Sequence, residues 1–210
     1  AIGIDPNFKE CLYNKGRTLE KLSNFTDALV CYDKVIKIDP QHVGALFNKG
    51  SILANRGEYS NAKIFFEKVI KIEPNNARAL LFIGIICLEN KEYYDSLTYI
   101  NKALSLDPND SFAWKSKGLL LYTQGKYNEA IECFDKAIEL SPKYAGAWNE
   151  KGMAYYAIGK YFDALECYEK AIEVDPSYYR AWANIGQVLE KLGRYTEASE
   201  SRSMAEELRK

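Results

Sequence analysis

Residues 145–176 read "AGAWNEKGMAYYAIGKYFDALECYEKAIEVDP", and this stretch recurs along the chain with a period of 34 residues. Its proline, Pro176, is one of six prolines, and the others precede it at the same interval: Pro6, Pro40, Pro74, Pro108 and Pro142. Six glycines keep this spacing, each ten residues after a proline: Gly16, Gly50, Gly84, Gly118, Gly152 and Gly186. A fixed period of this length is typical of folds built from repeated supersecondary units.

Each repeat contains the pattern of two amphipathic helices. With Lys9 as position 1, positions 4, 8 and 11 carry apolar or small residues at the spacing of one helical face, which predicts a first helix, helix A. A turn follows, with glycine at position 15 in four of six repeats and an aromatic residue at position 17 in all six. A second apolar stripe at positions 20, 24, 27 and 28 predicts helix B, which ends at the proline. Polar residues at position 18, such as Thr26 and Ser60, are its predicted N-caps.

The glycine at position 8 lies in the middle of predicted helix A, where it costs about 1 kcal/mol relative to alanine. Helix B carries a small residue at position 20 throughout: Ala28, Ala62, Ser96, Ala130, Ala164 and Ala198. We therefore expect helices A and B to approach closely at these two positions. Such a pair cannot bury its whole apolar face alone, so stacking of successive pairs is expected.

These residues resemble the tetratricopeptide repeat family, whose 34-residue unit has a W-L-G-Y-A-F-A-P pattern. The fifth repeat matches it with Trp148, Gly152, Tyr155, Ala164, Tyr168, Ala171 and Pro176. The resemblance covers essentially the whole chain in six repeats: 9–42, 43–76, 77–110, 111–144, 145–178 and 179–210. It implies an all-α fold, a right-handed α-solenoid superhelix of antiparallel helix pairs with helix A on the concave face. One departure is position 7, usually leucine, which is lysine in four repeats and is expected to pack its stem and leave its ammonium in water.

The charge balance argues against two classes of partner. The chain has 28 basic and 29 acidic residues, whereas nucleic-acid and membrane-surface binding usually need an excess of Lys and Arg on one face. No apolar run of 18 or more residues and no signal-peptide pattern is present. The expectation is a soluble, cytoplasmic protein without a membrane partner.

The inventory of reactive side chains does not indicate an enzyme. His42 is the one histidine and lies in a turn between repeats, and no Gly-rich phosphate loop, nucleophile elbow or HExxH motif occurs. The five cysteines form no CxxC pair; three share position 23, and Cys11 lies in a column otherwise filled by alanine, which favours packed structural thiols. We therefore expect no catalysis, cofactor, metal or small-molecule substrate, and the resemblance likewise implies a non-enzymatic protein.

The family resemblance implies that positions 2, 5, 6, 9, 12 and 13 of helix A face the concave groove. The family's two-carboxylate clamp for acidic C-terminal peptides fits this chain poorly: the positions hold Tyr13, Arg17, Asn48, Arg78 and Phe82 from the first repeat, and Lys115, Leu119, Glu150, Arg180 and Asn184 from the fourth. Binding of chaperone tails is therefore not predicted. A looser anion site at Asn14, Arg17, Asn48 and Arg78 stays an alternative.

Apolar side chains occupy nominally concave positions in the middle repeats, and exposed apolar surface of this extent usually marks an interaction site. We expect a protein-protein interaction scaffold whose groove binds an extended or helical segment of a partner. The candidate groove residues are Asn14, Arg17, Asn48, Arg78, Phe82, Ile85, Phe112, Lys115, Tyr122, Asn149 and Tyr156. Alternatively, Leu81 and Leu88 turn into the interface between repeats and leave a smaller patch.

Two rival functions belong to other classes. An RNA-binding helical repeat could stack bases on its aromatic residues, but balanced charge and acidic groove residues speak against it. A self-associating scaffold would stack arrays end to end. In the last helix B, columns that are mostly apolar elsewhere become Ser199, Arg202 and Glu206, which predicts a C-terminal cap. At the other end, residues 1–8 align with the end of a helix B and are expected to be the tail of a truncated preceding repeat, leaving a face for end-to-end association.

Overall fold

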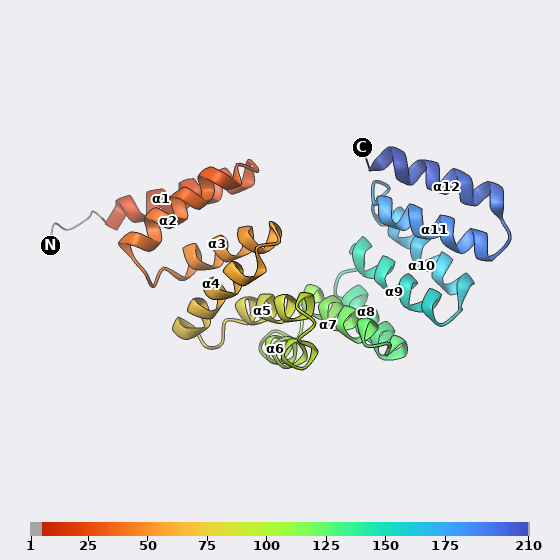
Figure 1. Ribbon diagram of the computed structural model, residues 1–210, viewed down its shortest axis with the longest axis horizontal. Helices are drawn as coiled ribbons and strands as arrows, with labels where there is room; N and C mark the ends of the chain where they lie inside the picture. Colours follow the sequence, from red (N-terminus) through yellow and green to blue (C-terminus); the bar gives the residue numbers. More distant parts are fainter. Residues whose placement is uncertain (1–5, 210) are drawn as a thin grey trace. The chain divides into compact units, whose positions relative to one another are not determined.

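The computed structural model describes residues 6–209, and within that range it holds twelve α-helices and no β-strand (Figure 1). The helices are α1 (Pro6–Lys21), α2 (Phe25–Ile38), α3 (Val43–Asn55), α4 (Tyr59–Ile72), α5 (Ala77–Glu89), α6 (Tyr93–Leu106), α7 (Ser111–Thr123), α8 (Tyr127–Leu140), α9 (Ala145–Ala157), α10 (Tyr161–Val174), α11 (Tyr179–Lys191) and α12 (Tyr195–Leu208). Odd-numbered helices are the predicted A helices, and each packs along the B helix that follows it. The all-α fold of tandem antiparallel pairs is thus confirmed.

The helices keep the period of the sequence. The B helices begin at residues 25, 59, 93, 127, 161 and 195, and the A helices from α3 onward begin at 43, 77, 111, 145 and 179, so each start follows the previous one by 34 residues. Helix α1 differs, because it begins at Pro6, three residues before Lys9. Proline suits the first position of a helix, where its missing N–H would have no partner. Residues 1–5, on which the expectation of a tail depends, lie outside the described residues.

Two compact parts make up the chain: an N-terminal half, Ala1–Leu106, with α1–α6, and a C-terminal half, Asp107–Lys210, with α7–α12. Within each half, B helices also pack against the next A helix, as α2 does on α3 and α8 on α9. Neighbouring A helices contact each other as well, α3 with α5 and α9 with both α7 and α11. The A helices within a half therefore share one side, which carries the candidate groove residues.

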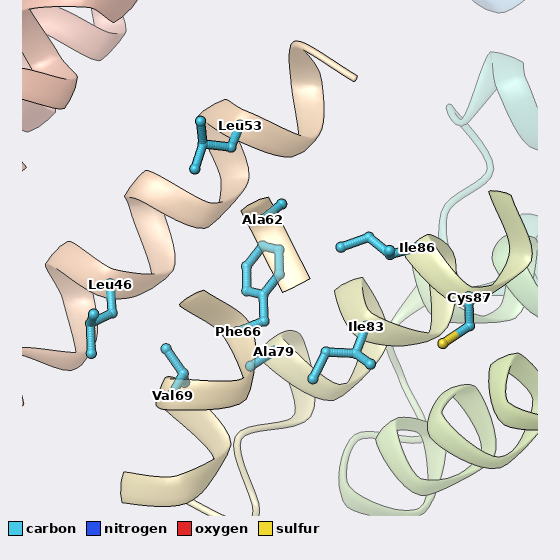
Figure 2. Close-up of a cluster of buried hydrophobic side chains, with 9 residues drawn as sticks. All are labelled: Leu46, Leu53, Ala62, Phe66, Val69, Ala79, Ile83, Ile86 and Cys87. Atoms are coloured by element: carbon cyan, nitrogen blue, oxygen red, sulfur yellow. The ribbon is translucent and has the colours of Figure 1, made fainter. Parts of the chain in front are cut away.

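The core of the N-terminal half joins three helices of two repeats. Figure 2 shows side chains of α3, α4 and α5 converging around Phe66, which is fully buried. In the C-terminal half, Tyr168 of α10 takes the equivalent place in a cluster that includes Ala164, Ala181 and Ile185 of α10 and α11. Phe66 and Tyr168 both occupy position 24, so in these two repeats one large residue of helix B links its own repeat to the next.

The mid-helix glycines leave room for this same residue. A Cβ atom on Gly118 would lie 2.6 Å from Phe134 Cε1, and one on Gly152 would lie 2.6 Å from Tyr168 Cε1. Close approach of helix B at position 8 is therefore as predicted, but the group that fills the gap is the large side chain at position 24 rather than the small residue at position 20. The small residue makes the contact through its backbone oxygen in two repeats, at Ser96 and Ala198.

In the turn from helix A to helix B, the residue at position 15 has a left-handed backbone conformation in every repeat. Four repeats have glycine there, with φ between 75° and 78°, and the first and third have Ser23 at 59° and Lys91 at 63°. Each B helix begins at position 17, so position 16 is its N-cap and the caps predicted at position 18, such as Thr26, are wrong. Asn24 caps α2 by accepting a hydrogen bond from the backbone N–H of Asp27.

Lysine at position 7 joins neighbouring repeats at two of its four positions, instead of pointing only into water. Lys49 of α3 forms an ion pair with Asp33 of α2, and Lys151 of α9 pairs with Asp135 of α8 at 2.7 Å. The Lys49 ammonium also lies 4.6 Å from the centroid of the Phe65 ring. Because the carboxylates are about half exposed, each pair contributes at most about 1 kcal/mol.

Four of the five thiols are buried, including the three that share position 23, as predicted, and all five are free. Burial raises the pKa of Cys133 to about 11 and that of Cys167 to about 12, which keeps both protonated and unreactive at neutral pH. Cys11 is exposed, contrary to the packed site predicted for its column. Its counterparts Ala45 and Ala79 are covered by α2 and α4, and among the described helices none precedes α1.

The last B helix presents a polar surface. Ser199, Arg202 and Glu206 of α12 are exposed, and the Arg202 guanidinium forms an ion pair with Glu190 of α11. The Arg202 stem crosses Gly186 where other repeats place an aromatic or aliphatic side chain, with Cγ 2.8 Å from a Cβ built there. The role of this repeat as a C-terminal cap stays a prediction.

We predict that Gly118→Ala destabilises the protein by about 1–2 kcal/mol, because overpacking against Phe134 outweighs the better helix propensity of alanine. Gly50→Ala is the matched control, since it also faces a phenylalanine, Phe66, but at 3.1 Å, and it should be close to neutral. The free energies of unfolding in urea measure both. Equal losses in the two variants would contradict the role given to position 24.

Ser23→Gly and Lys91→Gly should each stabilise the protein by about 0.5–1 kcal/mol, because a left-handed backbone strains residues other than glycine and the flexibility of glycine in the unfolded chain offsets only part of the gain. Gly57→Ala should cost about 1 kcal/mol through the backbone alone, since no atom lies within 4 Å of the added Cβ. Unfolding midpoints that rise for Gly57→Ala would refute this account.

Candidate functional site

The A helices of each half carry positions 2, 5, 6, 9, 12 and 13 on one side, which we call the A face. In the N-terminal half, polar groups of this face are engaged with one another. Asn48 of α3 donates a hydrogen bond to Tyr32 Oη at 3.1 Å, and Tyr32 Oη donates to the Glu20 carboxylate at 2.8 Å. Arg17 lies 5.8 Å from the centroid of the Tyr13 ring, and Asn14 is exposed.

The alternative anion site is only partly assembled. Arg17 and Asn48 line one depression, but Glu20 lines it too and adds a negative charge. Arg78 is absent from that lining and lies 4.8 Å from the centroid of the Phe47 ring. Two of the four proposed residues therefore share a site, and that site is not purely cationic.

The apolar groove residues of α5 mostly face the interior. Phe82 stacks on Phe66 with ring centroids 5.0 Å apart, and it packs against the buried core. Leu81 and Leu88 are 2% and 8% exposed. Ile85 is half-buried. The burial of Leu81 and Leu88 favours the alternative in which they turn into the interface between repeats, and Phe82 and Ile85 remain as half-buried apolar residues of α5.

The A face of the C-terminal half carries charged groups on three successive A helices: Lys115 of α7, Glu150 of α9 and Arg180 of α11. The Lys115 ammonium lies 5.1 Å from the ring centroid of Phe112 and 5.6 Å from that of Tyr144. Among the described residues, neither Lys115 nor Glu150 forms an ion pair within 4.0 Å. Both groups are partly buried.

Burial dominates the titration of both groups. It lowers the pKa of Lys115, against the attraction of Glu150, and it raises the pKa of Glu150, against the attraction of Lys115 and Arg180. Desolvation therefore disfavours both charges, and their mutual attraction does not compensate for it. A ligand that brought further hydrogen-bonding groups would relieve part of this cost.

Four further candidates lie on the same two helices as Lys115 and Glu150, α7 and α9. Asn149 was predicted as a ligand contact but is 1% exposed; it accepts a hydrogen bond from Asn184 Nδ2 at 2.8 Å and thereby joins α9 to α11 beneath the face. Tyr122 and Tyr156 are half-buried, with ring centroids 5.3 Å from Tyr127 and 5.4 Å from Tyr161. Phe112 is 37% exposed.

Sequence reasoning missed two tyrosines and undervalued two charges of this face. Tyr144 and Tyr178 occupy position 34 of consecutive repeats, and their recurrence in one column was the available signal. A Cβ built on Gly146 of α9 would lie 3.2 Å from Tyr144 Cε2, closer than an ordinary contact, so a glycine at position 2 leaves room for the Tyr144 ring; Tyr178 Oη lies at 3.9 Å, in ordinary contact. Glu150 and Arg180 were considered only as a poor match to the carboxylate clamp.

Other chemistry has little support in the described part of the chain. Residues 6–209 contain no group of three or more His, Cys, Asp or Glu side chains that could hold a metal ion. None of the described helices is long and apolar enough to cross a membrane. His42 caps α3 by accepting a hydrogen bond at Nδ1 from the backbone N–H of Ala45, at 3.1 Å.

Comparison with known families agrees with the geometry. Models described as tetratricopeptide repeats match residues 10–42, 43–76, 77–110 and 99–132, and a model described as a TPR repeat matches residues 118–159 and 152–193. The chain belongs to the tetratricopeptide repeat family. Members of this family and its structural neighbours are typically non-enzymatic scaffolds for protein interaction.

Solved structures of TPR proteins are similar to this one. MamA is 29% identical with a TM-score of 0.64, covering 76% of this chain and 94% of its own. YrrB, described as a TPR protein with an unusual peptide-binding site, is 26% identical with a TM-score of 0.60, covering 81% and 88%. The pilF protein of Pseudomonas aeruginosa, at 20% identity, shares the fold with a TM-score of 0.77, covering 92% and 88%. No curated protein sequence matches this TPR chain.

We predict that Glu150→Gln makes the pH dependence of stability shallower. The raised pKa means that the folded protein holds this proton more tightly than the unfolded chain does, so the wild type loses stability as pH rises from about 4.3 through the raised value. The variant should therefore be more stable than the wild type at pH 7 and lose this advantage toward pH 5. Urea unfolding at both pH values measures it.

Glu166→Gln is the control for loss of one carboxylate, because Glu166 is exposed on α10. A Glu150→Gln variant that is less stable than the wild type at pH 7 would show that the attraction of Lys115 and Arg180 outweighs burial.

Proposed function

We propose that this TPR protein is an interaction scaffold that holds a peptide segment of a partner protein on the A face of its C-terminal half. The observation that carries the proposal is that Lys115 of α7 and Glu150 of α9 are partly buried and form no ion pair within the described residues. Extended peptides offer both donors and acceptors to such groups. YrrB, a similar structure, is described as having an unusual peptide-binding site, which supports the same class of ligand.

The tyrosines of this face strengthen the proposal. Tyr122, Tyr144, Tyr156 and Tyr178 are all half-buried, so each presents part of an aromatic ring and a hydroxyl beside the charges. Tyrosine and arginine are enriched at protein interfaces because they combine apolar area with hydrogen bonding at a low cost in entropy. The N-terminal half supports such a role less, since Asn48, Tyr32 and Glu20 already satisfy one another.

The test is affinity capture from the native cell with quantitative mass spectrometry, comparing the wild type with a Lys115→Ala/Tyr122→Ala variant. Recovery of the principal partners should fall about tenfold or more, as expected when two central interface residues are truncated. Phe162→Ala is the matched control, because Phe162 is an aromatic residue of α10 that is 74% exposed. It should leave recovery unchanged.

Partners retained by the folded double variant would overturn the proposal. Salt-dependent retention of the wild type on an RNA column, or sedimentation that depends on concentration in the absence of partners, would favour the rival classes of RNA-binding repeat and self-associating scaffold.

A further inference from the structure

The hydroxyl of Tyr168 is a buried polar group that the fold leaves without a partner. Tyr168 lies on the B helix α10 and is 2% exposed. Its ring crosses helix α9 at Gly152, where an added Cβ would lie 2.6 Å from Cε1 and 3.0 Å from Cζ. Because glycine has no side chain, the Tyr168 ring of helix B can cross helix A at this position and extend toward the A face.

The N-terminal half shows what a tyrosine at this position contacts. Tyr32 also occupies position 24, and its ring crosses α1 at Gly16, with Cε1 2.7 Å from an added Cβ. Its hydroxyl emerges among A-face residues, where it donates to the Glu20 carboxylate at 2.8 Å and accepts from Asn48 Nδ2 at 3.1 Å. The carboxylate comes from position 12 of the same repeat and the amide from position 6 of the next.

Both of these partners are missing around Tyr168. Position 12 of its repeat is Tyr156, which has no carboxylate, and position 6 of the next repeat is Asn184, whose Nδ2 donates to Asn149. Within the described residues, Tyr168 Oη makes no hydrogen bond. Among the described residues, the side-chain N or O atom that is both fully enclosed and without a hydrogen-bond partner is Ser96 Oγ. Because Tyr168 Oη also has no partner, it cannot be fully enclosed. Tyr168 Oη therefore opens onto the A face.

The charged groups of this part of the A face carry a net positive charge, although the charged side chain that acts directly on the Tyr168 hydroxyl is the Glu150 carboxylate. Tyr122, Glu150 and Tyr156 are electrostatic neighbours of Tyr168, and Glu150 in turn interacts with Lys115 and Arg180. Two cations against one carboxylate leave a net charge of about +1. A single further carboxylate would balance this set, accept the Tyr168 proton in a charge-assisted hydrogen bond and so take the place that Glu20 holds beside Tyr32.

We propose that Tyr168 Oη forms the floor of a subsite that binds one acidic side chain, Asp or Glu, of the peptide held on the A face. This inference rests on the proposed function and adds the chemistry of the ligand. Lys115 and Arg180 attract the ligand carboxylate, and Glu150 opposes this attraction because it carries the same charge as the ligand.

The experiment begins with selection of a random dodecapeptide phage library on the full chain. Selected peptides are labelled, and each Asp or Glu is replaced in turn by Asn or Gln. One such replacement should weaken binding to the wild type about tenfold, the effect of losing a charged hydrogen-bond partner. The parent peptide should bind the Tyr168→Phe variant about tenfold more weakly than it binds the wild type. Replacing the acidic residue of the peptide should then change its affinity for this variant less than about twofold.

The variants separate binding from folding. Tyr168→Phe should fold normally, with an unchanged melting temperature, because Phe66 and Phe134 occupy position 24 in other repeats. Tyr32→Phe is the matched control: it removes a hydroxyl that has two partners, so it should lower the melting temperature and leave peptide affinity within about twofold. Glu150→Gln should strengthen binding of the acidic peptide.

The two proposals fail in different ways. Selected peptides that lose affinity for Lys115→Ala/Tyr122→Ala, but whose binding to the wild type and to Tyr168→Phe depends equally on the acidic residue, overturn this inference and leave the proposed function standing. Selected peptides that bind without needing any acidic residue also overturn this inference and leave the proposed function standing. Recovery of no peptide, or of peptides indifferent to Lys115→Ala/Tyr122→Ala, overturns both.

Discussion

The packing of the position-24 side chain of helix B across the position-8 glycine of helix A is the contact on which the rest of this fold depends. It sets the distance between the paired helices, because a Cβ at Gly118 or Gly152 would overlap the facing aromatic ring. The same ring also packs against the next A helix, as Phe66 does between α3 and α5. One residue thus fixes both the pair and the step to the following pair, which is why a costly mid-helix glycine recurs.

A consequence of this contact is that helix B contributes to the A face. Where position 24 is phenylalanine, as at Phe66 and Phe134, only apolar surface passes through the gap at glycine. Where it is tyrosine, the hydroxyl emerges among the polar residues of positions 6 and 12, as the Tyr32 contacts demonstrate. The surface available to a partner is therefore set by both helices of a repeat, although only helix A lies along it.

The sequence was sufficient for the fold and for only part of the candidate site. Periodic proline and glycine predicted the repeat, because both residues act on the backbone directly. Side-chain direction depends on packing, so the burial of Leu81 and Asn149 at nominally open positions could not be read from position alone. The exposure of Cys11 could not be read from its position either, because the residue at this position of helix A is buried only where the B helix of the preceding repeat packs against it.

The two halves use one scaffold in different ways, and the difference lies in few residues. In the N-terminal half, Glu20 at position 12 satisfies the tyrosine hydroxyl internally, and the network is closed. In the C-terminal half, Tyr156 holds that position, and the carboxylate nearest to the tyrosine, Glu150, lies at position 6 of helix A, where burial raises its pKa. Moving one carboxylate along the helix converts a closed hydrogen-bond network into an open one. Repeats that fold identically can therefore differ in what they bind, because the packing contact that builds them leaves positions 6 and 12 free to vary.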